Sequence, residues 1–420
     1  MTPARHPERS GGGAKSSGCP HQRARGPSRN APRFLDSLRS LGMTVGLGMT
    51  VLTSTALSAQ QPWSVRVANS VMQRGPAAVY GKWDYTAGLV LLGLERVGER
   101  TGDPAYAAYI KRSVDSLVHP DGSIATYNPA EHNLDQINEG RVLFALYDRT
   151  HDARYARAAD RLREQLRNQP RTSEGGFWHK DIYPQQMWLD GLYMAEPFYA
   201  EYAARHHDTT AMNDVVHQFL LIARHTRDPK TGLFYHAWDA THHQPWADPT
   251  TGDSKNFWGR ADGWYLMAAM DVLDYLPKDL PQRGALIQVV QQLARAVANV
   301  QDPVSGVWWQ VLDQPNRAKN YLEASSSAMF VYAFAKGARM GYLAPTYRRL
   351  AERGFDGMLK TFVTVDPGGL VSINGICKVA GLGGNPPRDG SYAYYVSEPV
   401  VSNDYKGVGA FILAANELGR

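Results

Sequence analysis

The sequence predicts an all-α protein in which six inner helices are surrounded by six outer helices. Three observations lead to this prediction. Six acidic residues each open a stretch rich in apolar residues, amphipathic segments follow five of these stretches, and short glycine-containing segments lead back to the next one. A supersecondary unit that recurs along a chain is the sequence signature of a repeat architecture. We therefore expect residues 60–420 to form one domain of repeated helical hairpins.

The predicted inner helices are dense in Ala, Leu, Gly, Met and aromatic residues, as in 87–94, 328–335 and 409–415, which indicates helices buried all round. The acidic residues that open the six stretches are Asp84, Asp135, Asp190, Asp262, Glu323 and Asp404. An acidic side chain at a helix start accepts free backbone N–H groups and faces the positive end of the helix dipole. We interpret Asp262 and Asp404 chiefly as such caps. Asp84 and Glu323 fit either a cap or a functional role.

The predicted outer helices carry one apolar stripe, for example Tyr106, Ile110, Val114 and Leu117. Spacings of three and four residues predict one dry face and one wet face. Five such helices follow the inner ones, and the segment 63–73 can supply the sixth. Packed beside the last inner helix, it would close an (α/α)₆ barrel. The unit length varies between roughly 50 and 80 residues, outside the regular solenoid periods, so an open superhelix is disfavoured.

Short segments with glycine and aromatic residues separate the repeats, for example 175–178, 232–235 and 306–309. Glycine supplies the turn, and the aromatic neighbours predict short strands or hairpins at one rim. The acidic helix openings of a ring would lie at the same rim. We therefore expect the active site there.

Residues 1–59 have the features of a targeting leader rather than of a fold. A basic, Gly-, Pro- and Ser-rich start precedes an apolar stretch from Leu41 to Leu52, and small residues end the segment at Ala59. We expect an exported protein, cleaved after Ala59. The leader holds 8 Lys and Arg against 2 Asp and Glu, a net charge of +6, whereas the whole chain is at +5. The remainder is thus near −1, which argues against binding to nucleic acid or to an anionic membrane.

The sequence contains no motif for a metal or an organic cofactor. After leader removal Cys377 is the only cysteine, which excludes an internal disulfide and a thiolate-rich zinc site. The pairs His206-His207 and His242-His243 lack the spacing of a helical metal pair. Nucleophile-elbow, Walker A and dinucleotide motifs are also missing, and no later apolar run reaches membrane-spanning length. We expect neither a metal nor a cofactor.

Asp135 and Asp190 differ from the other four acidic residues in their neighbours. Asp135 lies within Asn133-Leu134-Asp135-Gln136-Ile137-Asn138, and Asp190 follows Met187-Trp188-Leu189. Both carboxylates thus lie among groups that hydrogen-bond to sugars or stack on them. When two carboxylates share one pocket, one of them stays protonated, and such an acid can donate a proton near neutral pH. Asp190 and Asp135 are therefore the candidate catalytic residues.

The candidate substrate-binding residues come from the helix starts and the rim segments. Aromatic rings offer flat apolar faces to sugar rings, and Arg can bind a carboxylate with two donors. These candidates are Trp83, Tyr85, Asn138, His179, Lys180, Met187, His236, Trp258, Arg260 and Trp264. For any single Trp the alternative is ordinary packing, and for His236 it is a structural role.

Several segments together resemble glycoside hydrolase family 105, over nearly all of residues 60–420. They are 134–138, 176–180, 183–191, 258–264 and 321–325, followed by 381–384, 389–392 and 403–407. This family contains unsaturated rhamnogalacturonyl hydrolases. The related family 88 contains unsaturated glucuronyl hydrolases with the same barrel.

The resemblance implies an exo-acting hydrolase that removes a 4,5-unsaturated uronic acid from lyase-generated oligosaccharides by hydrating its vinyl ether. Asp190 matches the general acid/base of the family, which would protonate C4 and then help to deprotonate the water that adds at C5. Asp135 would hold the water and tune Asp190. The positions that match those holding the unsaturated sugar are His179, His236, Arg260, Trp258 and Trp264. The source polymer, of rhamnogalacturonan or pectin type or of ulvan type, stays open.

Two other functions fit the sequence. An (α/α)₆ polysaccharide lyase or a sugar epimerase shares the architecture but needs a base that abstracts a carbon-bound proton. A non-catalytic glycan-binding barrel needs only the aromatic side chains at the rim. A lyase creates ultraviolet absorbance by forming double bonds, whereas the expected hydrolase removes it. The sign of the absorbance change therefore separates the enzymes, and its absence identifies the binding protein.

Overall fold

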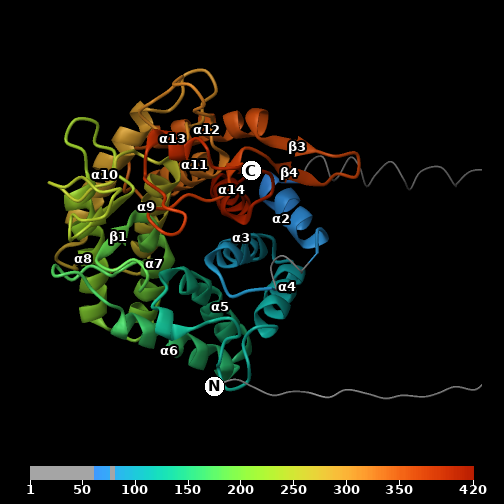
Figure 1. Cartoon of the computed structure of the whole chain (residues 1–420). Helices are drawn as coiled ribbons and strands as arrows, with labels where there is room; N and C mark the ends of the chain where they lie inside the picture. The colour runs from blue at the N-terminus through green and yellow to red at the C-terminus, as the bar shows by residue number, and fades with distance from the viewer. Residues whose placement is uncertain (1–60, 76–80) are drawn as a thin grey trace, which may run out of the picture. The chain divides into compact units, whose positions relative to one another are not determined.

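The computed structural model describes residues 61–75 and 81–420, so the expected leader lies outside the described residues. In the described part, six inner and six outer helices form a ring (Figure 1). The inner helices are α3 (Tyr85–Thr101), α5 (Arg141–Thr150), α7 (Leu189–Arg205), α9 (Gly259–Val272), α11 (Ala324–Arg339) and α14 (Tyr405–Leu418). The outer helices are α2 (Trp63–Gln73), α4 (Pro104–Asp115), α6 (Ala153–Asn168), α8 (Thr209–Thr226), α10 (Arg283–Asn299) and α12 (Thr346–Thr361). The all-α, (α/α)₆ prediction is confirmed.

The ring closes between its first and last helices. Each inner helix contacts the next, and α14 contacts both α11 and α3. Helix α2 packs against α14, as the sequence predicted for the segment 63–73. The N–H of Ser64 also donates to the carbonyl of Arg420 over 3.0 Å, which ties the start of α2 to the end of α14. The twelfth helix is therefore supplied from the opposite end of the domain.

Burial distinguishes the inner helices from the outer ones. Every residue of α9 is buried, whereas α6 buries only a stripe that includes Tyr155, Leu162 and Leu166. Helices that are apolar on all faces thus form the inner ring, and helices with one apolar stripe at a period of 3.6 residues form the outer ring, as the sequence indicated. Helix α5 is the exception among the inner helices, since its last four residues are exposed. No helix in the described ranges is both long enough and apolar enough to span a bilayer.

The acidic residues occupy different positions at the helix starts. Asp84, Glu323 and Asp404 are N-caps whose carboxylates accept backbone N–H groups of α3, α11 and α14. The cap predicted for Asp262 is wrong, because Asp262 lies in the first turn of α9 and accepts the N–H of Phe234 from the preceding rim segment, over 3.3 Å. Asp135 does not open its helix either. It lies within the first of two 3₁₀ turns, Leu134–Gln136 and Asn138–Gly140, that precede α5.

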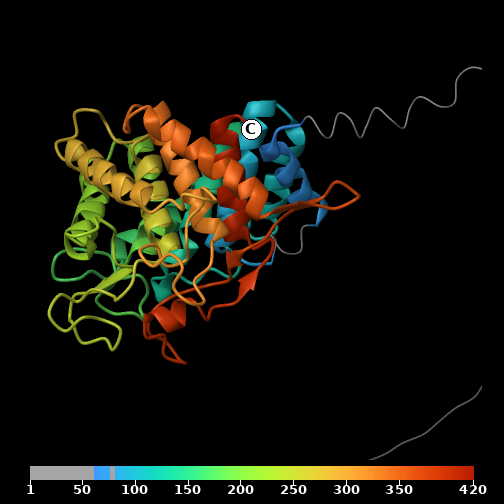
Figure 2. The same ribbon diagram turned by 90° about the horizontal axis from the view of Figure 1, so that it is seen from above.

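Short antiparallel strand pairs form in the connections between helices. They are β1 (Gln186–Trp188) with β2 (Ala237–Asp239), β3 (Val363–Val365) with β4 (Val371–Ile373), and β5 (Ile376–Cys377) with β6 (Val400–Val401). The long connections, among them the short helix α13 (Tyr392–Tyr395), gather at one end of the ring (Figure 2). Trp188 faces Ala237 across the first pair, so this ladder fixes the segment before α7 against the segment that carries His236.

Side chains fill the centre of the ring. Tyr193 of α7 stacks on Trp264 of α9, with ring centroids 4.7 Å apart. Further along α9, the buried Asp271 pairs with Arg141 of α5 at 2.9 Å and with Lys336 of α11 at 2.8 Å. Asp271 and Lys336 lie near the C-terminal ends of their helices. A buried charge network therefore joins three inner helices, from the C-terminal ends of α9 and α11 to the first residue of α5.

Candidate active site

The starts of the inner helices converge on one group of ionisable side chains. Tyr85, the first residue of α3, shows this most clearly. Burial, followed by the carboxylates of Asp135, Asp84 and Asp190, raises the pKa of Tyr85 well above its ordinary value, and the charge of Arg260 partly offsets them. These groups belong to α3 and to the segments that open α5, α7 and α9. The helix starts therefore lie within electrostatic range of one another.

Asp190 lies in the first turn of α7 and contacts a buried histidine. Its Oδ2 atom is 3.0 Å from Nε2 of His236, a close contact that is not aligned as a hydrogen bond. The other ring nitrogen of His236, Nδ1, is 2.7 Å from the hydroxyl of Tyr395 in α13. The N–H of Leu189 donates to the carbonyl of His236 over 3.0 Å. Asp190 is thus held beside the imidazole of His236, whose Nδ1 atom already contacts Tyr395. His236 and Tyr395 are 0% exposed, whereas Asp190 is 9% exposed.

We expect Tyr395→Phe to lower kcat about fivefold, because a neutral hydrogen bond contributes about 1 kcal/mol and His236 would lose the partner of its Nδ1 atom. Steady-state kinetics with a thermal unfolding control would measure this effect. The matched control is Tyr394→Phe, whose hydroxyl accepts the N–H of Gly381 and does not touch His236. Equal activity of the two variants would show that Tyr395 does not orient His236.

Asp135 lies in a 3₁₀ turn and faces two nitrogen donors. Its Oδ2 is 2.5 Å from Nζ of Lys180, and its Oδ1 is 3.3 Å from Nε2 of His179. Burial opposes the charged form, but the charge of Lys180 and the hydrogen bonds from Lys180 and His179 outweigh it and hold the pKa of Asp135 below its ordinary value. Asp135 is therefore the ionised carboxylate of the candidate pair.

The segment that holds Asp135 packs directly against the start of α7. His179 stacks on Trp188, with ring centroids 4.6 Å apart and planes 11° from parallel. A Cβ atom on Gly191, the residue after Asp190, would lie 3.1 Å from Nδ1 of His179 and 3.3 Å from the side chain of Leu134. The glycine therefore allows the Asp135 segment to approach the Asp190 segment closely, which brings both candidate catalytic residues to one site.

We expect Lys180→Met to move the acid limb of the pH–rate profile to higher pH. Asp135 would lose the cation that keeps its pKa low, so its carboxylate would become protonated at a higher pH than in the wild type. A protonated Asp135 would no longer hold the attacking water. The profile of kcat/KM against pH measures the shift. Lys82→Met is the control, because Lys82 is an exposed cation at the same rim, 3.7 Å from Asp84. An acid limb that stays in place would show that Lys180 does not act on Asp135.

Arg260 and Glu323 form a buried ion pair at the starts of α9 and α11. Both side chains are fully buried, with Nη2 of Arg260 3.4 Å from Oε1 of Glu323. Nε of Arg260 donates to the hydroxyl of Ser325 over 2.7 Å, and Nη2 also donates to the carbonyl of Cys377. Nη1 has no partner among the described residues. The guanidinium thus keeps one buried donor free, beside the ring of Trp258.

Four candidate binding residues lie in the packing beneath the rim. The indole N–H of Trp83 donates to the carbonyl of Gln136 over 2.7 Å, and the amide of Asn138 donates to the carbonyl of Tyr193 over 2.9 Å. Met187 is packed against the backbone at Gly176, and Trp264 stacks on Tyr193. All four are at most 2% exposed, because their side chains join neighbouring segments of the barrel. His236, Trp258 and Arg260 are buried to the same degree. Tyr85, Asp135 and Lys180 are partly exposed, and the side chain of Asp190 is 13% exposed.

Two kinds of site residue were missed by reasoning from the sequence. Tyr395 contacts His236 although 159 positions separate them, and the only signal was its place in the tyrosine-rich segment 392–395. Ser325 binds Arg260 and was not predicted, whereas Glu323, expected as either a cap or a functional residue, both caps α11 and pairs with Arg260. In the described ranges, no group of three or more His, Cys, Asp and Glu side chains is arranged to hold a metal ion.

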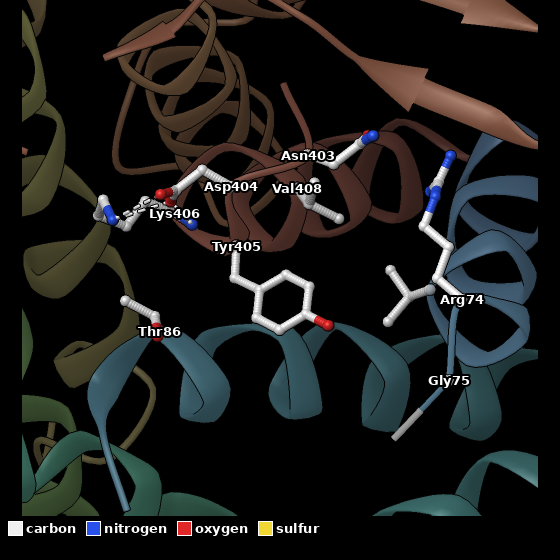
Figure 3. Close-up of a pocket in the computed structure, with 9 residues that line it drawn as sticks. Arg74, Gly75, Thr86, Asn403, Asp404, Tyr405, Lys406 and Val408 are labelled. Atoms are coloured by element: carbon white, nitrogen blue, oxygen red, sulfur yellow. Dashed lines mark hydrogen bonds and ion pairs between the residues drawn. The ribbon is translucent and has the colours of Figure 1, made fainter. Parts of the chain in front are cut away.

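A cavity of about 340 Å³ lies between the end of α2 and the starts of α3 and α14 (Figure 3). It does not contain Asp190 or Asp135. The ring of Tyr405 points from α14 toward α3, and Lys406 pairs with Asp404 at 2.8 Å. Burial and the charge of Arg260 lower the pKa of Lys406, although Asp404 opposes the shift. The cavity wall is therefore in electrostatic contact with the buried Arg260.

The comparisons with known proteins define the class. The sequence model of Glycosyl Hydrolase Family 88 matches residues 63–420, and the chain belongs to this family. A solved structure of a glycoside hydrolase from family 105 of C. acetobutylicum is 44% identical, with a TM-score of 0.84, and the match covers 86% of this chain and 99% of that one. The resemblance to families 105 and 88 is therefore confirmed, and the protein is a glycoside hydrolase.

Two curated proteins give further matches. Protein Atu3128 of Agrobacterium fabrum is 37% identical over 232 residues, which cover 53% of this chain and 97% of that protein. The unsaturated rhamnogalacturonyl hydrolase YesR of Bacillus subtilis is 27% identical over 266 residues, which cover 61% of this chain and 72% of that enzyme.

Proposed function

We propose that this glycoside hydrolase removes a 4,5-unsaturated uronic acid from the non-reducing end of oligosaccharides that a polysaccharide lyase has produced. The observation that carries the proposal is the unequal setting of the two carboxylates. Lys180 and His179 hold Asp135 ionised, whereas Asp190 forms no ion pair with Lys or Arg within the described residues and lies beside His236. The name of the B. subtilis relative supports the same substrate class.

The chemistry assigned to Asp190 is the hydration of a vinyl ether. Asp190 gives its proton to C4 of the unsaturated ring, and positive charge develops at C5 and the ring oxygen. A water molecule held by Asp135 adds at C5 and returns a proton to Asp190, which restores the acid. The hemiketal at C5 then opens, and the hemiacetal at C1 releases the neighbouring sugar. One water is consumed, and no nucleophilic carboxylate attacks C1, unlike in ordinary retaining hydrolysis.

We assign the uronate carboxylate of the substrate to Arg260. Its Nη1 atom is a buried donor without a protein partner, beside Trp258 and close to Tyr85. A buried donor left unpaired costs free energy, and a carboxylate oxygen would satisfy it with a charge-assisted hydrogen bond. Arg260 and Asp190 both lie within electrostatic range of Tyr85, which supports a sugar ring bound between them.

The closed end of the barrel supports exo action. The network of Arg141, Asp271 and Lys336 fills the centre of the ring. A saccharide would therefore enter from the rim with one chain end first. The leaving saccharide would extend into the cavity beside Tyr405 and Lys406. Oligosaccharides rather than internal positions of a polymer are therefore the proposed substrates.

Ultraviolet absorbance tests the proposal directly. The protein is incubated separately with lyase-generated disaccharides from rhamnogalacturonan, other pectins, ulvan and glycosaminoglycans, and the absorbance of the conjugated double bond is followed. We expect it to decay with one of them, which identifies the source polymer. A rise of absorbance with intact polymer would identify a lyase instead, and binding without any change would identify a glycan-binding barrel.

Export remains part of the proposal. Residues 1–59 have the basic start, apolar stretch and small-residue end of a signal peptide. Amino-terminal sequencing of the protein from the cell exterior or periplasm should begin at Gln60. A cytoplasmic protein that retains Met1 would contradict this.

A further inference from the structure

A small cavity lies between the catalytic rim and the middle of α7. Its volume is about 10 Å³, which is room for about one water molecule. The walls include His179 and Gly191 on the rim side, and Glu196 of α7 and Gln218 of α8 deeper in the fold. The cavity therefore connects the histidine that contacts Asp135 with a carboxyl group in the barrel wall.

Two buried polar atoms on these walls have no protein partner, namely Nδ1 of His179 and Oε2 of Glu196. Glu196 is 1% exposed. Burial, reinforced by the charge of Asp214, raises the pKa of Glu196 well above its ordinary value, although Arg171 and Arg163 oppose the shift. Burial thus favours the protonated form of Glu196, which can donate a hydrogen bond.

The remaining contacts fix the direction of the donors. Nε2 of His179 faces the ionised Asp135 at 3.3 Å, so in the neutral imidazole this nitrogen carries the proton and Nδ1 is left as the acceptor. Oε1 of Gln218 accepts the N–H of Phe177 over 2.8 Å and keeps a second lone pair. A water in the cavity would thus have three polar partners, the number typical of buried water.

We propose that Glu196 is a positioning residue for the reaction, acting on Asp135 through one buried water molecule and His179. The carboxyl donates to the water, the water donates to Nδ1, and Nε2–H donates to Asp135. This order of donors selects the Nε2–H tautomer of His179. That tautomer donates to Asp135, the carboxylate that holds the attacking water. The expected effect of Glu196 on kcat rests on the proposed function, whereas the tautomer of His179 does not depend on it.

Two replacements of Glu196 separate positioning from packing. Glu196→Gln keeps a donor, so kcat should stay within about twofold of the wild type. Glu196→Met removes the donor at similar volume and should lower kcat about tenfold, with KM nearly unchanged. Thermal unfolding of both variants is measured, and kcat is compared at a temperature at which each variant is fully folded. Loss of activity in the Met variant would therefore not come from unfolding.

The tautomer of His179 is read by ¹⁵N NMR of the imidazole, with His179→Asn identifying the signal. We expect an unprotonated Nδ1 and a protonated Nε2 in the wild type and in Glu196→Gln, and a mixture in Glu196→Met. Full activity of the Met variant, equal losses in both variants, or a proton on Nδ1 in the wild type would overturn the proposal. If the wild type acted on no unsaturated oligosaccharide, the proposed function would fail, and the NMR comparison would still decide the tautomer.

Discussion

We expect Asp190→Asn to lower kcat by about 1,000-fold, within the range that general acid–base catalysis contributes. Asparagine keeps the shape of the side chain and its place beside His236, but it cannot give a proton to C4 or accept one from water. Substrate binding should persist, because the predicted binding groups are unchanged. Decay of the substrate absorbance measures kcat, and calorimetry with the inactive variant measures affinity.

The matched control for this variant is Asp181→Asn. Asp181 is a partly exposed carboxylate in the same rim segment, paired with His132 at 3.0 Å and remote from the Asp190–His236 contact. Its replacement should leave kcat within about twofold, as for surface substitutions in general. Undiminished turnover in Asp190→Asn would remove the acid from the mechanism and with it the proposed function.

The second large effect is expected on stability, from Arg260→Met. The replacement leaves Glu323 as a fully buried carboxylate without its cationic partner. Breaking a buried ion pair from one side destabilises a protein by about 3–5 kcal/mol, because the remaining charge is uncompensated. Chemical denaturation measures the free energy of unfolding. A loss below about 1 kcal/mol would contradict the assignment of a structural ion pair.

The double variant Arg260→Met, Glu323→Gln separates stability from substrate binding. The second replacement would remove the unpaired charge, and the new amide oxygen would still accept the N–H of Ser326 that caps α11. The amide nitrogen would face the N–H of Cys377, which Oε1 accepts in the wild type, so only part of the lost stability should return. Activity should not return, since the donor assigned to the uronate is missing. A double variant with wild-type KM and kcat would show that Arg260 serves the fold alone.

The architecture was predictable because repeated local patterns in the sequence specify its helices. Apolar stretches opened by acidic residues predicted the inner ring, and the apolar spacing in 63–73 predicted α2 as the closing helix. The failures concern helix starts. A carboxylate before an apolar stretch reads as a cap, but Asp135 lies within the first of two 3₁₀ turns that precede α5, and Asp262 accepts a hydrogen bond from the rim segment at Phe234. Local pattern does not show such tertiary partners.

The site was predictable to the extent that its residues are neighbours in sequence. His179 and Lys180 are adjacent, and the structure brings both to Asp135. Nothing local distinguishes Trp83, with its indole bound to a carbonyl in the packing, from a Trp that lines a cleft. Tyr395 could not be found either, because the contact with His236 depends on the C-terminal segment packing over the rim.

Turnover in D₂O tests the central claim most directly. If Asp190 protonates the double bond, the released uronic acid, examined by NMR at early times, carries one deuterium at C4 in a single configuration, and its C4 vinyl proton signal is gone. A freshly released uronic acid that retains the vinyl proton at C4 and the ultraviolet absorbance would contradict the account, since the glycosidic bond would then have been cleaved without hydration of the double bond.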